Sequence, residues 1–168
     1  MQPGCGNPAL AIGSTPGQNL CMTRVDSLPA DLVARLQGRN LIVFDGACVF
    51  CSAFFRFMLR HDRREIFSYA TAQSPLGQGL YAALDLPLTD FETNLILVDG
   101  VIYQRLDAFA AAMAQLGYPW RALALCRHLP VWLKDAIYKP IARNRYRIFG
   151  RYEACLIPDA RLRARFLG

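Results

Sequence analysis

Two cysteines, Cys48 and Cys51, are the residues whose types and spacing point most directly to chemistry. Two residues separate them, so in a helix they occupy positions i and i+3, one turn apart on the same side. Sulfur atoms at this spacing can approach to bonding distance without unwinding the helix. The pair can therefore cycle between a dithiol and a disulfide, or its thiolates can bind a metal ion.

The residues around the pair predict that it lies where a strand turns into a helix. Leu41–Phe44 is a continuous apolar run closed by Asp45 and Gly46, which indicates a buried strand ending in a turn. From 48 to 60, apolar residues recur with helical spacing on one face. The residues of this face are Cys51, Phe54, Phe55, Met58 and Leu59. The first turn of the predicted helix therefore holds both cysteines.

Cys48 is predicted to be the nucleophile because it lies nearest the start of this helix. Unpaired N–H groups and the helix dipole favour an anion there and lower the pKa of a thiol. The Cys48 thiolate would attack a substrate disulfide and form a mixed disulfide. Cys51, on the apolar face, would resolve it and release the reduced product. The reverse reaction would oxidise a dithiol.

Asp45 and Gly46 are further candidates because they directly precede the pair. The Asp45 carboxylate could accept the proton of Cys51 during resolution. Its side chain could instead bond the backbone of the turn that follows, and the sequence does not choose between the two roles. Gly46 is expected to border the substrate and to adopt a turn conformation that a side chain would disfavour.

The order of the remaining predicted elements indicates a fold class. Helices are expected at 30–37, 75–84, 107–116, 120–128 and 131–147, and strands at 66–70, 94–98 and 101–104, with a hairpin turn at 99–100. A parallel βαβ unit followed by a hairpin is the order of the thioredoxin core, a four-stranded mixed sheet flanked by helices. Pro140 should kink or interrupt the last helix.

The chain is predicted to form one domain in three parts. Residues 1–39 would be a flexible extension with a short helix, 40–119 the thioredoxin-like core, and 120–168 a helical extension of the same domain. Residues 1–120 carry 8 Lys and Arg against 10 Asp and Glu, a net charge of −2, whereas residues 121–168 carry 11 against 3, a net charge of +8. The basic character therefore belongs to the C-terminal extension.

Three segments together resemble the DCC family of predicted thiol-disulfide oxidoreductases. The family is named for its Asp-x-x-Cys-x-x-Cys motif, whose positions are filled here by Asp45, Cys48 and Cys51. Leu95–Gly100 resembles the family's hairpin strand and Asn144–Gly150 its tail, so the resemblance covers about residues 40–157. It implies a thioredoxin-like fold and protein-disulfide reduction. The expected partners are a disulfide-containing protein or small thiol substrate and an upstream thiol reductant, with no cofactor.

One segment departs from thioredoxins, which place a cis-proline followed by Thr at the start of the strand facing the redox pair. The comparable segment here, Phe91–Asn94, contains no proline. Glu92 or Thr93 is predicted to face the sulfur atoms instead and to border the substrate. The missing proline also leaves metal ligation by the cysteines open.

Two other classes of function remain open. One is a zinc or iron–sulfur module that uses the same pair, where Cys126 and His128 could complete a Cys3His zinc site or simply be a core thiol and a helix-end histidine. The other is a non-catalytic interaction domain that acts through the basic extension. Its interleaved arginines and aromatics could contact an anionic membrane surface, but a solvated helix face is commoner and nucleic acid is not expected. Cys155 is either a third redox thiol or a packing thiol.

The composition indicates a globular protein of the cytoplasm. Hydrophobic residues make up 54% of the chain, yet no apolar run approaches the roughly 18–20 residues of a membrane span. The N-terminal residues lack the basic and apolar regions of a secretory signal. Six cysteines in 168 residues are too sparse for a secreted disulfide scaffold.

Overall fold

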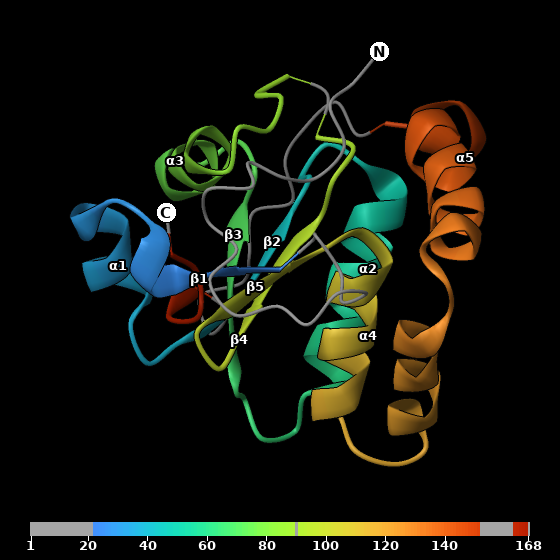
Figure 1. The fold of residues 1–168 in the computed structure, drawn as a ribbon, viewed down its shortest axis with the longest axis horizontal. Coiled ribbons are helices and arrows are strands. Elements are labelled where there is room, and N and C mark those ends of the chain that lie inside the picture. Colours follow the sequence, from blue (N-terminus) through green and yellow to red (C-terminus); the bar gives the residue numbers. More distant parts are fainter. Residues whose placement is uncertain (1–21, 90, 152–162, 168) are drawn as a thin grey trace.

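The computed structural model describes residues 22–89, 91–151 and 163–167, and its strands form one mixed sheet in the order β1-β5-β4-β2-β3 (Figure 1). The strands are β1 (Met22–Arg24), β2 (Asn40–Phe44), β3 (Phe67–Thr71), β4 (Leu95–Val98) and β5 (Val101–Gln104). β2 pairs in parallel with β3 and antiparallel with β4, which continues into β5. This arrangement confirms the predicted thioredoxin-like sheet.

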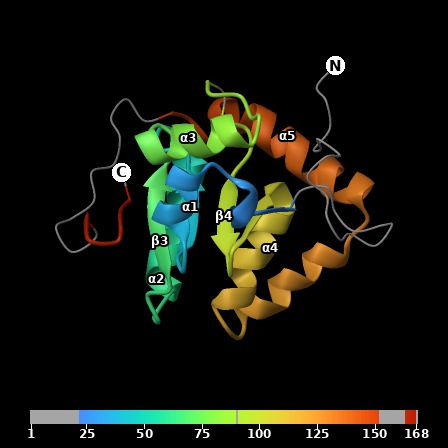
Figure 2. The same cartoon turned by 60° about the vertical axis from the view of Figure 1, so that its left-hand side comes forward.

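Helices cover both faces of the sheet. They are α1 (Ala30–Leu36), α2 (Val49–His61), α3 (Pro75–Ala83), α4 (Arg105–Gln115) and α5 (Val131–Phe149), with short 3-10 helices at Val25–Ser27 and Trp120–His128. Figures 1 and 2 place α1 beside α3 on one side of the sheet, whereas α2 and α4 lie on the other with α5 outside them. In the described part of the chain, no helix is long and apolar enough to cross a membrane.

Strand β2 lies inside the sheet between β4 and β3, and this position explains why its sequence is apolar without alternation. Leu41 and Val43 belong to the core under α1 and α3, whereas Ile42 and Phe44 belong to the core under α2 and α4. A strand covered on both faces buries every side chain. Its C-terminal end is therefore a rigid support for the residues that follow.

The hairpin between β4 and β5 has the predicted two-residue turn. Asp99 has φ +49° and Gly100 has φ +76°. Positive φ at both central residues is what a type I′ turn requires and what Asp-Gly supplies. Helix α4 begins at Arg105, two residues before the predicted start, so Asp107 lies in its first turn.

Two expectations need correction, one for residues 22–24 and one for Pro140 in α5. Residues 22–24, which were placed in the flexible extension, form β1 as a fifth strand antiparallel to β5. Pro140 does not interrupt α5, which runs unbroken from Val131 to Phe149. The Asn144 side-chain amide donates to the Pro140 carbonyl at 2.9 Å, a polar contact within the helix next to the proline. Residues 1–21, part of the predicted flexible extension, lie outside the described residues.

Helix α5 is fastened to the domain by polar side chains along one face. The Lys134 ammonium donates to the Asp107 carboxylate of α4 at 2.6 Å, and both side chains are less than 10% exposed. One turn on, the Tyr138 hydroxyl lies 2.8 Å from the Glu92 carbonyl oxygen and from Asn94 Oδ1. A third anchor, Arg145, reaches the residues next to the cysteines.

Replacing Lys134 by methionine should lower the free energy of unfolding by about 3–5 kcal/mol, because it leaves the buried Asp107 carboxylate without its partner. The matched control is Lys139→Met, which removes an ion pair between Lys139 and Asp135 whose side chains are 49% and 26% exposed. That change should cost only about 0.3–0.5 kcal/mol. Urea denaturation measures both, and equal losses would contradict this account of how α5 is held.

Candidate functional site

Cys48 is the N-cap of α2. Its backbone is extended, with φ −89° and ψ 123°, and its Sγ accepts a hydrogen bond from the Cys51 backbone N–H at 3.3 Å. The sulfur therefore occupies the place that a Ser or Asp oxygen usually takes at a helix start. Because that place favours negative charge, the structure puts Cys48 where a thiolate is stabilised. Both cysteines are free thiols.

The two thiols have opposite acidities. The pKa of Cys48 is lowered to about 6, chiefly because the Cys51 thiol donates to its sulfur, with help from the Cys51 N–H and the nearby Arg145 charge. Burial and the Asp45 charge act against this shift. The pKa of Cys51 is raised well above its ordinary value by the same hydrogen bond and by burial. At neutral pH the pair is therefore a thiolate at Cys48 and a thiol at Cys51.

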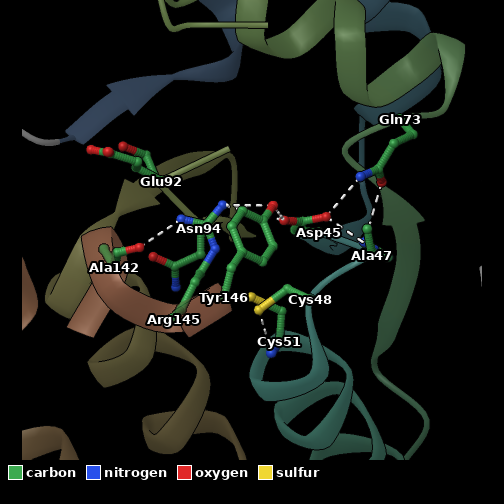
Figure 3. Close-up of polar contacts among 12 residues, drawn as sticks. Asp45, Ala47, Cys48, Cys51, Gln73, Glu92, Asn94, Ala142, Arg145 and Tyr146 are labelled. Carbon is green, nitrogen blue, oxygen red and sulfur yellow. Dashed lines mark hydrogen bonds and ion pairs between the residues drawn. The ribbon is translucent and has the colours of Figure 1, made fainter. Parts of the chain in front are cut away.

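Asp45 comes directly after β2, three residues before Cys48, and is 3% exposed. Its Oδ1 accepts from the Ala47 N–H at 3.0 Å and from the Gln73 side-chain amide at 2.7 Å. Its Oδ2 accepts from Arg145 Nη2 at 3.2 Å and from the Tyr146 hydroxyl (Figure 3). The contact with Ala47 is the turn bond that the sequence offered as one of its two roles. Both carboxylate oxygens are occupied by donors.

Three side chains around Asp45 were not predicted as functional. Gln73 follows β3, the parallel neighbour of β2, so the two strands deliver Asp45 and Gln73 to the same edge of the sheet. Polar residues directly after paired parallel strands are a signal that could have identified Gln73. Arg145 and Tyr146 come from α5, about a hundred residues away, and only the family-like tail drew attention to their segment.

Arg145 is a buried cation within this cluster. It is 4% exposed, donates through Nη1 to the Ala142 carbonyl at 2.7 Å and through Nη2 to the Tyr146 hydroxyl at 3.0 Å. Its Nε has no hydrogen-bond partner among the described residues. Asp45 and Arg145 thus form a buried ion pair, and the Arg145 charge acts on both sulfur atoms.

The other predicted substrate-binding residues form hydrogen bonds through their backbone atoms. The Glu92 carbonyl oxygen accepts from Tyr138 and the Thr93 carbonyl oxygen from Tyr81. Figure 3 shows the Glu92 side chain directed away from the sulfur atoms. Gly46 donates its N–H to Gln73 Oε1 at 3.2 Å and is not among the glycines with positive φ. The expected special conformation of Gly46 is therefore not found, and its contact with substrate stays a prediction, as does that of Thr93.

No group of three or more His, Cys, Asp or Glu side chains converges to hold a metal ion within the described residues. Cys126 and His128 lie in the 3-10 helix Trp120–His128, and the structure does not join them to the cysteine pair. Cys155 falls outside the described residues.

The sheet topology and the dithiol at the start of α2 together define a thioredoxin-like protein with a candidate redox site. A family model described as DCC1-like thiol-disulfide oxidoreductase matches residues 42–151, and the chain belongs to this family. The match spans the motif cysteines and also Arg145 and Tyr146. Family membership supports a redox function of the thiols in general.

Two relatives extend this result. The chain is 32% identical to the uncharacterized protein YuxK of Bacillus subtilis over 128 residues, which cover 76% of this chain and 93% of YuxK. It is 27% identical to a chloroplastic DCC family protein of Arabidopsis thaliana over 118 residues, which cover 70% of this chain and 69% of the relative. No solved structure matches.

Proposed function

We propose that this protein is a thiol-disulfide oxidoreductase of the protein-disulfide reductase type. The observation that carries the proposal is the Cys48 sulfur at the N-cap of α2, hydrogen-bonded by Cys51 and held as a thiolate near neutral pH. A buried packing thiol needs neither feature. The disulfide-containing substrate, the upstream thiol reductant and the cytoplasmic location belong to this proposal.

The reaction consists of two exchanges. The Cys48 thiolate attacks one sulfur of the substrate disulfide, forms a mixed disulfide and expels the other sulfur as a thiolate. Cys51 then loses its proton and attacks the Cys48 sulfur, which releases the second substrate thiolate. Two electrons pass from the cysteine pair to the substrate, and an external dithiol reduces the resulting Cys48–Cys51 disulfide.

The first exchange itself prepares the second. In the resting site, the Cys51 pKa is raised chiefly because Cys51 donates to the Cys48 thiolate, then by burial and by the charge of that thiolate. Once the Cys48 sulfur is bonded to substrate it carries no charge, so the hydrogen bond to a thiolate and the charge effect disappear. Burial remains, but the Cys51 pKa falls. The expelled substrate thiolate or solvent can then accept the proton. Since the oxygens of Asp45 already accept four hydrogen bonds, we assign Asp45 a positioning role.

The pH dependence of alkylation tests the thiolate directly. Fully reduced protein is treated with iodoacetamide at a series of pH values, and the modified cysteine is identified by mass spectrometry. Because only the thiolate reacts, the rate at Cys48 should rise through about pH 6 and level off above it, whereas Cys126, whose pKa is raised by burial, should react only in alkaline solution. A Cys48 midpoint at about 8.5, the value of an ordinary thiol, would contradict the proposal.

A single-turnover experiment tests the reaction. Reduced protein is freed of reductant and mixed with an equimolar amount of insulin. The expected products are insulin thiols and a Cys48–Cys51 disulfide in the protein, mapped by peptide mass. If the protein stays fully reduced in the presence of insulin, it is not a reductase of protein disulfides.

A further inference from the structure

The nucleophile of this site has no exposed surface. Cys48 is 0% exposed, whereas Cys51 is partly exposed. Attack on a disulfide requires the substrate sulfur to reach bonding distance of the Cys48 sulfur. Some part of the protein that covers Cys48 must therefore move before the reaction begins.

One segment beside Cys48 is formed by the end of α5 and the residues after it, Phe149–Arg151, called here the cover segment. Arg151 forms an isolated antiparallel β-bridge with Cys48. A Cβ added at Gly150 would lie 3.9 Å from Val49 Cγ2, and the ring of Phe149 stacks on that of Phe50 with centroids 4.8 Å apart. The cover segment thus lies beside Cys48 and both residues between the two cysteines.

The cover segment has no buried ion pair of its own among the described residues, and the Arg151 guanidinium holds it to α5 by lying over the Tyr146 ring, 4.5 Å from its centroid. Phe149 is 42% exposed and Phe50 is 41% exposed, so their stacking is at the surface. Gly150 ends α5 with φ +85°, which marks a change of chain direction between the helix and Arg151. The buried anchors of α5, at Lys134 and Arg145, lie before this point. Phe149–Arg151 can therefore leave Cys48 while α5 stays docked.

We propose that Phe149–Arg151 is a displaceable cover of Cys48, and that an extended polypeptide carrying the substrate disulfide takes its place. The bridge between Arg151 and Cys48 shows that the Cys48 backbone accepts an extended chain beside it. Removing the cover segment exposes Val49 and the face of Phe50, so the favoured substrate has an apolar or aromatic residue near its cysteine. This inference rests on the proposed function for the identity of the attacking sulfur.

The rate at which Cys48 becomes alkylated measures the opening of the cover without requiring activity. At a pH above the Cys48 pKa, Phe149→Ser should be alkylated about three- to tenfold faster than wild type, the factor expected if opening breaks one aromatic pair. Ile148→Ser is the matched control, because Ile148 is the neighbouring residue of α5, is also apolar and is 63% exposed. It should react at the wild-type rate, and so should Phe149→Trp, which keeps the stacking.

Equal rates of Cys48 alkylation in Phe149→Ser and Ile148→Ser would contradict the proposal that Phe149–Arg151 covers Cys48. Circular dichroism and the urea midpoint establish that both variants remain folded. If Phe149→Ser is unfolded, Arg151→Pro provides the second variant, since it disturbs the bridge to Cys48 beyond the end of α5. It should also accelerate alkylation, and an unchanged rate would count against the proposal.

The substrate class is tested by the ratio of kcat/KM for two disulfides, a peptide with tyrosine beside its cysteine and glutathione disulfide. Wild type should prefer the peptide, and Phe149→Ser should raise kcat/KM for glutathione disulfide more than for the peptide. An equal increase for both would overturn the substrate assignment. If neither disulfide is reduced by any variant while the alkylation rates differ as expected, the cover stands and the proposed reductase function fails.

Discussion

Replacing Cys51 by serine should strongly reduce turnover and make the protein accumulate a covalent mixed disulfide with its substrate. The Cys48 thiolate still attacks, but no second thiol is present to resolve the mixed disulfide. Turnover with insulin should fall by at least about a hundredfold, because release then depends on slow attack by external thiols. Non-reducing electrophoresis should show a covalent complex that disappears on reduction.

Two variants make this result specific. Cys48→Ser should have neither turnover nor a covalent complex, whereas Cys126→Ser should turn over like wild type and, combined with Cys51→Ser, should still form the covalent complex. Cys51→Ala should raise the Cys48 pKa more than Cys51→Ser does, because serine can still donate a hydrogen bond to the Cys48 sulfur and alanine cannot. A covalent complex formed through Cys51 in the Cys48→Ser protein would reverse the assigned roles.

The cysteine pair was predictable because its signals are local. The apolar run of β2, the turn residues after it and the helical period of α2 lie within about twenty consecutive residues. Strand β1 was missed because three residues show no period, and its pairing with β5 joins positions far apart in the sequence. Local patterns predict elements, but they do not predict which distant edge a short strand joins.

The buried ion pair of Asp45 and Arg145 could not be predicted from the sequence for a different reason. Arginine is among the residue types least often buried, so the composition of α5 predicts a solvated basic helix and not a buried cation. Arg145 is buried because Asp45, a hundred positions earlier, supplies the compensating charge. Only the tertiary structure brings the two together. The same holds for Lys134 and Asp107 at the other end of α5.

Single substitutions at Asp45 and Arg145 should shift the Cys48 pKa in opposite directions. Arg145 lowers this pKa and Asp45 raises it. Arg145→Gln should therefore raise the Cys48 pKa from about 6, and Asp45→Asn should lower it, each by less than the loss of the Cys51 hydrogen bond would, because the two charges are the smallest effects on this pKa. The pH profile of iodoacetamide alkylation measures both. A shift in the same direction for the two variants would contradict the electrostatic account.

The reduction potential should follow the pKa. A more stable thiolate stabilises the reduced form, so Asp45→Asn should make the protein a stronger oxidant and Arg145→Gln a weaker one. Equilibration with mixtures of reduced and oxidised glutathione gives the two potentials. Each single variant also leaves one buried charge unpaired, which should lower stability by about 3–5 kcal/mol. The double variant removes both charges and should recover most of the stability and a Cys48 pKa near that of wild type.

The double variant also decides between the two roles of Asp45. If Asp45 acts through its charge, its replacement matters less once Arg145 is gone, and the double variant resolves mixed disulfides almost as fast as wild type. If Asp45 instead accepts the Cys51 proton, resolution slows in both backgrounds, whatever residue 145 is. Rapid-quench measurement of mixed-disulfide decay separates these outcomes. We expect the first, because the four donors around Asp45 leave its oxygens no place for a fifth.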